Sequence, residues 1–498
     1  MKSFIQINPA DSVAVALQDL PGIPTGHKFA LRDIAEGEDI IKYGNPIGHA
    51  TRAIRKGELV DHHNIATNLS GTLDYSSLSP DPSPVREGGK LTSAANQSPL
   101  PNRGGVGGGA TFLGYPRPDG QVGIRNDIWV IPTVGCVNNI CQRIVEEAGV
   151  GIHFSHPYGC SQLGDDHEST RLILRDMILH PNAGGVLVVG LGCENNQPRE
   201  LERLLGDYDR KRIRFLICQE VEGDEVEAGV QIVKELYEQA QTYQRVPVPI
   251  SSLRVGLKCG GSDGLSGITA NPLLGRFSDW LCAQGGSTIL TEVPEMFGAE
   301  HLLMRRSISE EVLQDTIHLI NDFKEYYLSH GQPVGENPSP GNKAGGISTL
   351  EEKALGCTQK SGSSPVCGVL KYGETLNSKL STLNSSGLHL LCAPGNDLVA
   401  STALAAAGCQ LVLFTTGRGT PFSTFVPTLK VSTNSDLFRR KPLWMDFNAG
   451  TLVSDDEPMD DLLARFTDLV LATANGMPTR AEQAGIHDIA IWKNGVTL

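Results

Sequence analysis

Cysteine follows four strand-like runs of the sequence, where parallel sheets commonly hold their ligands. The four residues are Cys136, Cys160, Cys193 and Cys259, and Gly, Asn, Asp and Ser surround them. In an open parallel sheet the carboxyl ends of the strands line the ligand crevice, and glycine lets the backbone approach a ligand closely. Three or four thiolates converging there would bind a soft metal ion or an iron–sulfur cluster. The alternative is that these cysteines are small side chains filling tight turns.

Histidines supply the candidate acid and base groups. Imidazole changes charge near neutral pH, which suits it to proton transfer. His156 shares a loop with Cys160, and His167 follows both. His63 opens a polar segment at the end of the N-terminal region, a position from which a small domain can complete a site on a larger one. We take His63, His156 and His167 as the candidate catalytic residues.

Cations and amides in Gly- and Asn-rich loops form a candidate anion-binding set. Its members are Arg125, Asn126, Asn271, Lys343 and Arg418. A guanidinium donates two parallel hydrogen bonds to a carboxylate. Each residue alone is as compatible with a surface charge, but several such loops in one chain favour a small anionic substrate.

A nicotinamide cofactor is an alternative. Gly190-Leu-Gly192 follows a strand-like run but has Asn195 where the dinucleotide fingerprint has its third glycine. The fingerprint places an acidic residue about twenty positions further on, and Glu220, 25 positions beyond Asn195, is near enough to keep this alternative. The match is weak, and no phosphate-binding loop of the G-x-x-x-x-G-K-[ST] type accompanies it.

The strands and helices that must position these residues are predicted from the order of apolar and amphipathic segments along the chain. From Phe112 onward, apolar strand-like runs alternate with helical patterns, which is typical of a mainly parallel α/β sheet. We predict a small β-rich domain, a flexible linker rich in Gly, Pro and Ser, and a large two-part α/β body. The expected ranges are 1–70, 71–112, 113–248 and 249–498.

Length and charge limit the function classes. The 498 residues suggest about three domains. With 42 basic and 56 acidic side chains the net charge is −14, which argues against a nucleic-acid partner. No apolar run approaches the roughly 20 residues of a membrane span, and the N-terminal residues do not resemble a signal peptide, so we expect a cytoplasmic protein. Eleven cysteines without a C-x-x-C pair argue against a disulfide framework or a zinc ribbon.

Long motifs along the chain resemble the altronate/galactarate dehydratase family, including an N-terminal module similar to the SAF (β-clip) domain. The motifs are Gly114–Asn126, Gly190–Asn196, Cys259–Pro272, Glu336–Gly346 and Thr416–Thr420. Three further segments look closer to the altronate branch than to the galactarate branch: Phe154–His167, Leu355–Lys360 and Asn494–Leu498.

The resemblance implies a hydro-lyase of hexuronate catabolism that removes water from D-altronate to give 2-dehydro-3-deoxy-D-gluconate. It implies iron as the metal, as Fe²⁺ or an iron–sulfur cluster, with Mn²⁺ as a substitute. A sugar acid is then the partner, and a homo-oligomer is expected. Rival hypotheses are galactarate dehydration, a nicotinamide oxidoreductase and a non-catalytic sugar-acid binding protein.

The N-terminal module departs from the family pattern in two places. Leu20–Gly26 replaces a longer hairpin, and the family's His-x-His-x-His-Asn segment becomes Leu59-Val-Asp61-His62-His63-Asn64. Only His63 matches a family histidine, and Asp61 takes the place of another. The segment is thus a poorer candidate for a multi-histidine cluster, and we expect the iron at the four cysteines instead.

Overall fold

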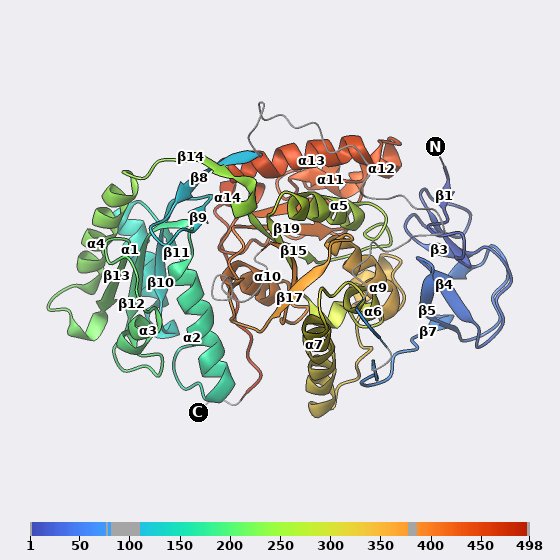
Figure 1. Cartoon of the computed structure of the whole chain (residues 1–498), viewed down its shortest axis with the longest axis horizontal. Helices are drawn as coiled ribbons and strands as arrows, with labels where there is room; N and C mark the ends of the chain where they lie inside the picture. Colours follow the sequence, from blue (N-terminus) through green and yellow to red (C-terminus); the bar gives the residue numbers. More distant parts are fainter. Residues whose placement is uncertain (1, 76–77, 81–109, 377–385, 496–498) are drawn as a thin grey trace.

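The computed structural model describes residues 2–75, 78–80, 110–376 and 386–495. They form an N-terminal module, a middle domain and a C-terminal domain, which lie at the right, the left and the centre of Figure 1. Most of the predicted linker, residues 81–109, lies outside the described residues. Within the described part, no helix is both long and apolar enough to cross a bilayer.

The N-terminal module is β-rich, as predicted. It has one sheet of order β1-β2-β3-β6 and another of order β4-β5-β7, with antiparallel pairing in both. Its strands are β1 (Phe4–Ile5), β2 (Val13–Ala16), β3 (Lys28–Ala30), β4 (Asp39–Lys42), β5 (Asn45–Ala50), β6 (Leu59–Val60) and β7 (Ile65–Ala66). Ile40, Ile47 and Ile54 form its core together with Ala354 and Leu355 of the C-terminal domain. The module is therefore packed against the body rather than merely tethered to it.

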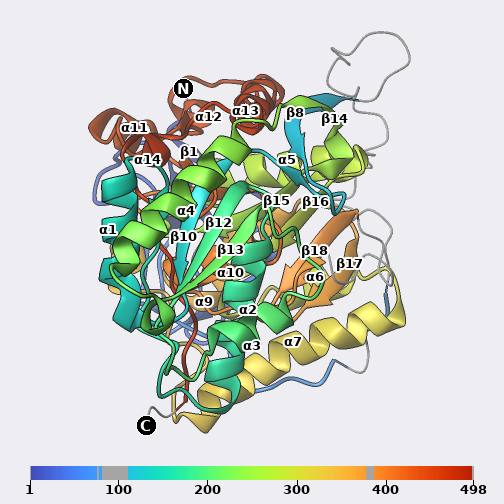
Figure 2. The same cartoon turned by 90° about the vertical axis from the view of Figure 1, so that its left-hand side faces the viewer.

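The middle domain is a parallel α/β sheet of order β11-β10-β12-β13, which confirms the predicted class. Its elements are β10 (Asp127–Pro132), α1 (Asn138–Ala148), β11 (Ile152–His153), α2 (Gly164–Leu179), β12 (Ala183–Gly190), α3 (Pro198–Leu204), β13 (Ile213–Ile217) and α4 (Glu225–Ala240). Side chains of α1 and α4 pack on one face of the sheet, and those of α2 and α3 pack on the other, as Figure 2 shows. Every residue of β12 is buried, as expected for a strand covered on both faces.

A three-stranded antiparallel sheet joins the two ends of the middle domain. Its strands are β8 (Thr111–Pro116), β9 (Val122–Gly123) and β14 (Val246–Pro249), in the order β14-β8-β9. It brings the start of the middle domain beside the start of the C-terminal domain.

The C-terminal domain contains a seven-stranded parallel sheet of order β17-β18-β16-β15-β19-β20-β21. The strands are β15 (Arg254–Cys259), β16 (Ser287–Leu290), β17 (Val366–Leu370), β18 (Gly387–Leu391), β19 (Leu411–Thr416), β20 (Thr428–Ser432) and β21 (Phe447–Asn448). The helices are α5 (Ala270–Ala283), α6 (Glu300–Met304), α7 (Glu310–Ser329), α8 (Pro340–Ala344), α9 (Leu350–Thr358), α10 (Asp397–Ala406), α11 (Ser435–Arg440), α12 (Thr451–Ser454), α13 (Met459–Ala474) and α14 (Arg480–Gln483). From β15 the chain forms the neighbouring strand β16, then the edge strand β17 and the strand β18 between them, and finally β19 on the other side of β15. This reversal is the topological switch point at which doubly wound sheets bind ligands.

The middle and C-terminal domains share one hydrophobic core. Trp129 and Phe154 of the middle domain contact Phe425 of the C-terminal domain, with ring centroids 5.5 and 6.4 Å apart. Leu404 of α10 belongs to the same buried cluster. The two α/β parts thus form a single packed body.

Candidate functional site

Two loops meet at the switch point of the seven-stranded sheet. One follows β15 and contains Gly261 and Asp263, and the other follows β19 and contains Gly417 and Arg418. The backbone N–H groups of Gly417 and Arg418 donate to the carbonyl oxygen of Gly261 at 3.1 and 3.0 Å. Gly261 has a φ of +61°, a left-handed conformation that favours glycine. The sequence motifs around Cys259 and Arg418 therefore come together in space.

A buried ionic network lies directly beneath these loops. Lys258 of β15 pairs with Glu292 and, at 2.9 Å, with Asp397 at the start of α10. Lys360 pairs with Glu292 at 2.9 Å, and Lys353 of α9 pairs with Glu295 at 2.7 Å. Burial alone would lower the pKa of Lys258, but the carboxylates of Asp397 and Glu292 raise it. Burial opposes ionisation of Glu295 too, yet Lys353 and Lys258 hold its pKa at about 2.

Two buried thiols border the same network. The sulfur atoms of Cys259 and Cys357 are 3.3 Å apart, and each lies 3.2–3.3 Å from Oε2 of Glu295. A hydrogen bond to Cys259, together with burial, raises the pKa of Cys357 well above its ordinary value. Lys360 donates to the sulfur of Cys259 at 2.7 Å. Cys259, Glu295 and Cys357 could surround a metal ion, but a cation there would face the ammonium groups that already engage these atoms, so the set fits an ion poorly.

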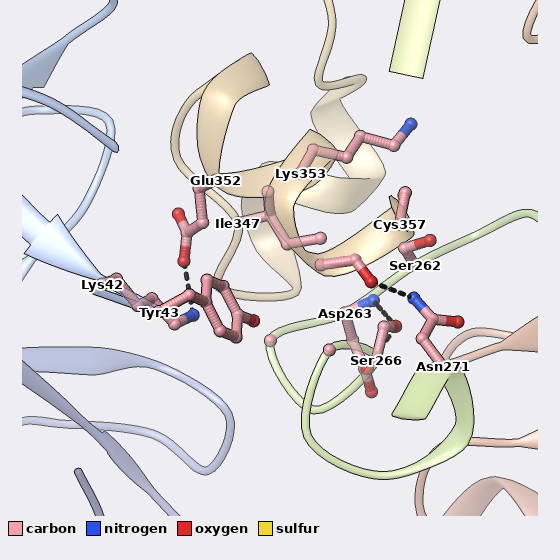
Figure 3. A pocket seen from close by; sticks show the side chains of 13 residues that line it. Lys42, Tyr43, Ser262, Asp263, Ser266, Asn271, Ile347, Glu352, Lys353 and Cys357 are labelled. Carbon is pink, nitrogen blue, oxygen red and sulfur yellow. Dashed lines mark hydrogen bonds and ion pairs between the residues drawn. The ribbon is translucent and has the colours of Figure 1, made fainter. Parts of the chain in front are cut away.

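A narrow polar pocket opens beside Cys357 (Figure 3). Its volume is about 10 Å³, roughly the room that one water molecule needs. Lys353 and Asp263 come from the C-terminal domain, whereas Lys42 and Tyr43 reach the pocket from the N-terminal module. The pocket therefore marks a junction between the two domains.

Two buried lysines of the N-terminal module fix that junction. Lys28 binds Glu352 of α9 at 2.8 Å and Lys42 binds the same carboxylate at 2.7 Å. Lys28 also donates to the carbonyl oxygen of Gly346 at 3.2 Å. Burial would raise the pKa of Glu352, but Lys28 and Lys42 hold it at about 2. This shared carboxylate orients the module on the body.

A loop of the module reaches the switch point itself. A Cβ on Gly264 would lie 1.8 Å from the carbonyl oxygen of Gly26, and one on Gly346 would lie 2.6 Å from that oxygen and 3.3 Å from Cα of His27. Only glycine at positions 264 and 346 leaves room for this loop. The half-buried His27 is consequently seated beside the loops that follow β15 and α8. In the sequence His27 is one of several histidines in polar or loop contexts, and only its packing against Gly346 singles it out.

The segment Asp61–His63 lies next to His27. Lys28 pairs with Val60 across β3 and β6, so the residues on either side of this pair are neighbours. Ligand atoms of Asp61, His62 and His63 lie within 4.8 Å of one another. Two imidazoles and a carboxylate form the donor set typical of ferrous iron, so these residues fit a single divalent ion.

Two of the cations predicted to bind the substrate, Arg418 and Lys343, lie at the switch point of the seven-stranded sheet. Arg418 is exposed and Lys343 of α8 is half-buried. Nε of Arg418 lies 3.8 Å from the position that a Cβ of Gly341 would take, which places it beside α8. Among the described residues neither cation has an ion-pair partner, unlike the lysines beneath them. Asn271 is buried in the same region, where it donates to the Gly356 carbonyl at 2.9 Å and accepts from Thr415 at 2.6 Å.

Comparison with known proteins decides the family. The chain is 53% identical to the altronate dehydratase of Bacillus subtilis (strain 168), over 100% of both chains. The chain belongs to the altronate/galactarate dehydratase family. It is 49% identical to the altronate dehydratase of Escherichia coli (strain K12), over 99% of this chain and 100% of that one. It is 32% identical to the galactarate dehydratase (L-threo-forming) of the same organism, over 97% and 95%.

Family models cover all three parts of the chain. The altronate/galactarate dehydratase SAF domain matches residues 2–68. The second domain of D-galactarate dehydratase/altronate hydrolase matches residues 114–241. The C-terminal domain of D-galactarate/altronate dehydratase matches residues 250–497. The resemblance noted from the sequence motifs is confirmed.

In this family member, the side chains of two predicted substrate residues are engaged by other parts of the protein, and one of these contacts crosses between domains. Arg125 forms a bidentate pair with Glu482 of α14 at 2.7 and 2.9 Å. Asn126 accepts from Arg117 at 3.0 Å and donates to the carbonyl oxygen of Ala240 at 2.8 Å. Both side chains thus join chain segments that are distant in sequence.

The remaining predicted histidines lie in the middle domain. Both ring nitrogens of His156 are engaged, with the Pro132 carbonyl at 2.9 Å and the Tyr158 N–H at 3.2 Å. His167 is half-buried in α2. Burial lowers the pKa of both imidazoles. Neither is brought next to His63 by any described contact.

In the predicted dinucleotide-binding loop, the backbone N–H groups are already bound by the side chain of Glu194 from the same loop. The N–H groups of Leu191 and Gly192 donate to the carboxylate of Glu194 at 3.0 and 2.6 Å. Glu220 pairs with Arg199 at the surface. These N–H groups would have to bind the phosphates of a nicotinamide cofactor, so the geometry argues against that alternative.

Proposed function

We propose that the chain is an altronate dehydratase, a hydro-lyase that converts D-altronate into 2-dehydro-3-deoxy-D-gluconate and water. The observation that carries this is the identity of 53% and 49% to altronate dehydratases over essentially the whole chain, against 32% for the galactarate enzyme. The substrate is a small sugar acid.

The switch point supplies the binding site for the acid group. Arg418 and Lys343 are the cations there without carboxylate partners among the described residues. A guanidinium holds a carboxylate through two parallel hydrogen bonds. The lysines beneath them are neutralised by Glu292, Glu295 and Asp397, so they set the local field without competing for the substrate.

The N-terminal module supplies the base. Dehydration requires a base for the proton on C2 and an acid for the hydroxyl on C3. His27 lies on the segment next to Asp61–His63 and packs against the loops at the switch point. The imidazole of His27 removes the C2 proton, the C3–O bond breaks as a water molecule gives a proton to the leaving hydroxyl, and the resulting enol becomes the 2-keto product. The imidazole is restored by proton exchange with water.

Iron is the proposed metal, with Mn²⁺ as a substitute. Asp61, His62 and His63 would hold a single ion, because their donor atoms lie within 4.8 Å of one another. Such an ion would stabilise negative charge developing on the substrate oxygens. Asp61 replaces a family histidine here, and a carboxylate suits Fe²⁺ and Mn²⁺ as well as an imidazole does.

The cellular context follows from the same proposal. A net charge of −14 gives no footprint for nucleic acid. We place the enzyme in the cytoplasm, with no nucleic-acid or membrane partner, and expect a homo-oligomer of the kind common among soluble enzymes.

The test is an anaerobic assay for 2-keto-3-deoxy acid formation. The purified full-length chain is incubated with D-altronate or galactarate, each with and without Fe²⁺ or Mn²⁺. Product from D-altronate at a kcat/KM at least about tenfold above that for galactarate is the expected result. A preference for galactarate, or binding of altronate without product, would overturn the proposal.

A further inference from the structure

Tyr43 lies in the hairpin turn between β4 and β5, in a backbone conformation that is unusual for an aromatic residue. The turn consists of Tyr43 and Gly44, which have φ values of +58° and +72°. Two-residue hairpin turns with positive φ at both positions are typically formed by Asn, Asp and Gly, and a bulky side chain rarely adopts such a φ. Strain of this kind is concentrated at functional sites. The turn itself does not require a tyrosine, so the side chain must be retained for what it contacts.

The side chain of Tyr43 reaches from the N-terminal module into the C-terminal domain. Figure 3 shows its hydroxyl directed toward the loop that carries Asp263 and Ser266. A Cβ on Gly267 would lie 2.3 Å from Oη of Tyr43, and one on Gly356 of α9 would lie 3.5 Å from it. The hydroxyl is therefore held between the loop that follows β15 and helix α9, in a space that exists because residue 267 is glycine.

The narrow pocket beside this hydroxyl has the size and polarity to hold one water molecule. Its volume is about 10 Å³, and Tyr43, Ser262 and Cys357 are among the residues that line it. A bound water needs roughly 10–15 Å³ and two to four polar partners. The buried hydroxyl of Ser262 has no hydrogen-bond partner among the described residues. Because buried polar groups are nearly always paired, a water molecule in the pocket accounts for this hydroxyl.

Tyr43 is the proton donor that remains available at the pocket. The other titratable side chains that line it already have partners within the protein, and they are Lys42, Glu352, Lys353, Asp263 and Cys357. Burial raises the pKa of the Tyr43 hydroxyl, the ammonium of Lys42 lowers it, and Glu352 raises it further. The hydroxyl is thus protonated at neutral pH and able to donate. Nζ of Lys42 lies 4.9 Å from the centre of the ring, where its charge favours the tyrosinate that remains after the proton has left.

We propose that this pocket holds the water molecule that protonates the leaving hydroxyl, and that Tyr43 supplies the proton to that water. The inference rests on the proposed dehydration and names the source of its acid proton. As the C3–O bond breaks, its electron pair stays on the leaving oxygen, which takes a proton from the pocket water. That water takes the proton from Oη of Tyr43, and the leaving group departs as water. The tyrosinate beside Lys42 then recovers a proton from the solvent.

Tyr43→Phe tests this proposal, because it removes the hydroxyl and keeps the ring. The variant is compared with the unmodified full-length chain on D-altronate and on an analogue with fluorine in place of the C3 hydroxyl. Both substrates give the same 2-keto-3-deoxy acid, but fluoride is a weak base that leaves without a proton donor, whereas hydroxide needs one. With D-altronate, kcat should fall by about 10²–10⁴-fold, the contribution of a positioned proton donor, with little change in KM. Fluoride release, followed with a fluoride-selective electrode, should stay close to that of the unmodified chain.

Tyr237→Phe is the matched control, since Tyr237 is an exposed tyrosine of α4, and it should change neither rate. Fluoride release also reports on the fold, because it requires an intact base and an intact binding site. An unchanged kcat for D-altronate in Tyr43→Phe, or equal losses on both substrates, would overturn the inference and leave the proposed function standing. No turnover of D-altronate by the unmodified chain would overturn the proposed function itself, so the two failures are distinguishable.

Discussion

Single residues at the switch point differ in whether their charge is already neutralised. Lys258, Lys353 and Lys360 have carboxylate partners at close range. Arg418 is exposed at the same edge without one among the described residues. A hydrogen bond to a charged group contributes about 1.5–3 kcal/mol. A substrate carboxylate therefore gains the most binding free energy at Arg418, whose charge is not already neutralised.

Replacing Arg418 should weaken substrate binding more than turnover. Arg418→Ala is expected to raise KM for D-altronate by about 10–100-fold, which corresponds to the loss of one charged hydrogen-bonding group. Arg418→Lys should recover only part of the affinity, because an ammonium cannot form the bidentate contact. Steady-state kinetics measure both, with the exposed Arg439→Ala as the matched control. An unchanged KM in Arg418→Ala would remove this residue from the site.

Replacing His27 should act on turnover instead. Loss of a positioned general acid or base costs about 10²–10⁴-fold, so His27→Asn is expected to lower kcat by that factor with little change in KM. The pH–rate profile should also lose one limb, which a purely structural effect would not cause. His330→Asn, at the exposed end of α7, serves as control. Full activity in His27→Asn would assign the proton transfer elsewhere.

At the scale of elements, the sequence predicts the positions of strands better than it predicts which side chains meet at the candidate site. The strands β10, β12 and β19 are largely apolar runs, because both faces of a parallel sheet are covered, and their ends predict a ligand edge. Glu295 and Lys353 were missed. They stand 58 positions apart in ordinary helical surroundings, and only the packing of α9 against the segment after β16 brings them to 2.7 Å.

The same limit explains the fate of the four predicted cysteines. Their shared position after strands is real, but position along a strand does not say which sheet the strand joins. Cys259 ends a strand of the seven-stranded sheet, whereas Cys136, Cys160 and Cys193 lie in the segments that follow strands of the four-stranded sheet. Strand order depends on long-range packing, so a motif count cannot resolve it.

The contact between the N-terminal module and α9 should make stability depend on acid pH. Glu352 has an ordinary pKa of 4.5, and Lys28 and Lys42 lower it to about 2 in the folded protein. The unfolded chain therefore binds a proton more readily, and the stabilisation is complete above about pH 4.5 and is lost as the pH falls toward 2. Glu352→Gln should lower the free energy of unfolding at pH 7 by about 3–5 kcal/mol, because two buried ammonium groups lose their partner.

Urea denaturation between pH 3 and pH 7 measures this effect. The difference between the unmodified chain and Glu352→Gln should shrink as the pH falls. Replacing the exposed Glu325 by Gln is the matched control, and it should leave the free energy of unfolding unchanged at every pH. A pH-independent difference would show that Glu352 is not held ionised by the lysines.

At the scale of the whole molecule, the shared core predicts that the two α/β domains unfold together. Phe425 is 3% exposed and packs its ring against Trp129, Phe154 and His180 of the middle domain. Removing a buried phenylalanine costs about 3–5 kcal/mol. Because this side chain fills space between the domains, Phe425→Ala should destabilise both rather than its own alone.

Hydrogen exchange can distinguish cooperative from independent unfolding. In Phe425→Ala, amide protection should fall by a similar factor in β12 of the middle domain and in β20 of the C-terminal domain, since both would open through one transition. Leu443→Ala, at a side chain that is 75% exposed, should leave both strands unchanged. Faster exchange confined to β20 would mean that the domains fold as separate units.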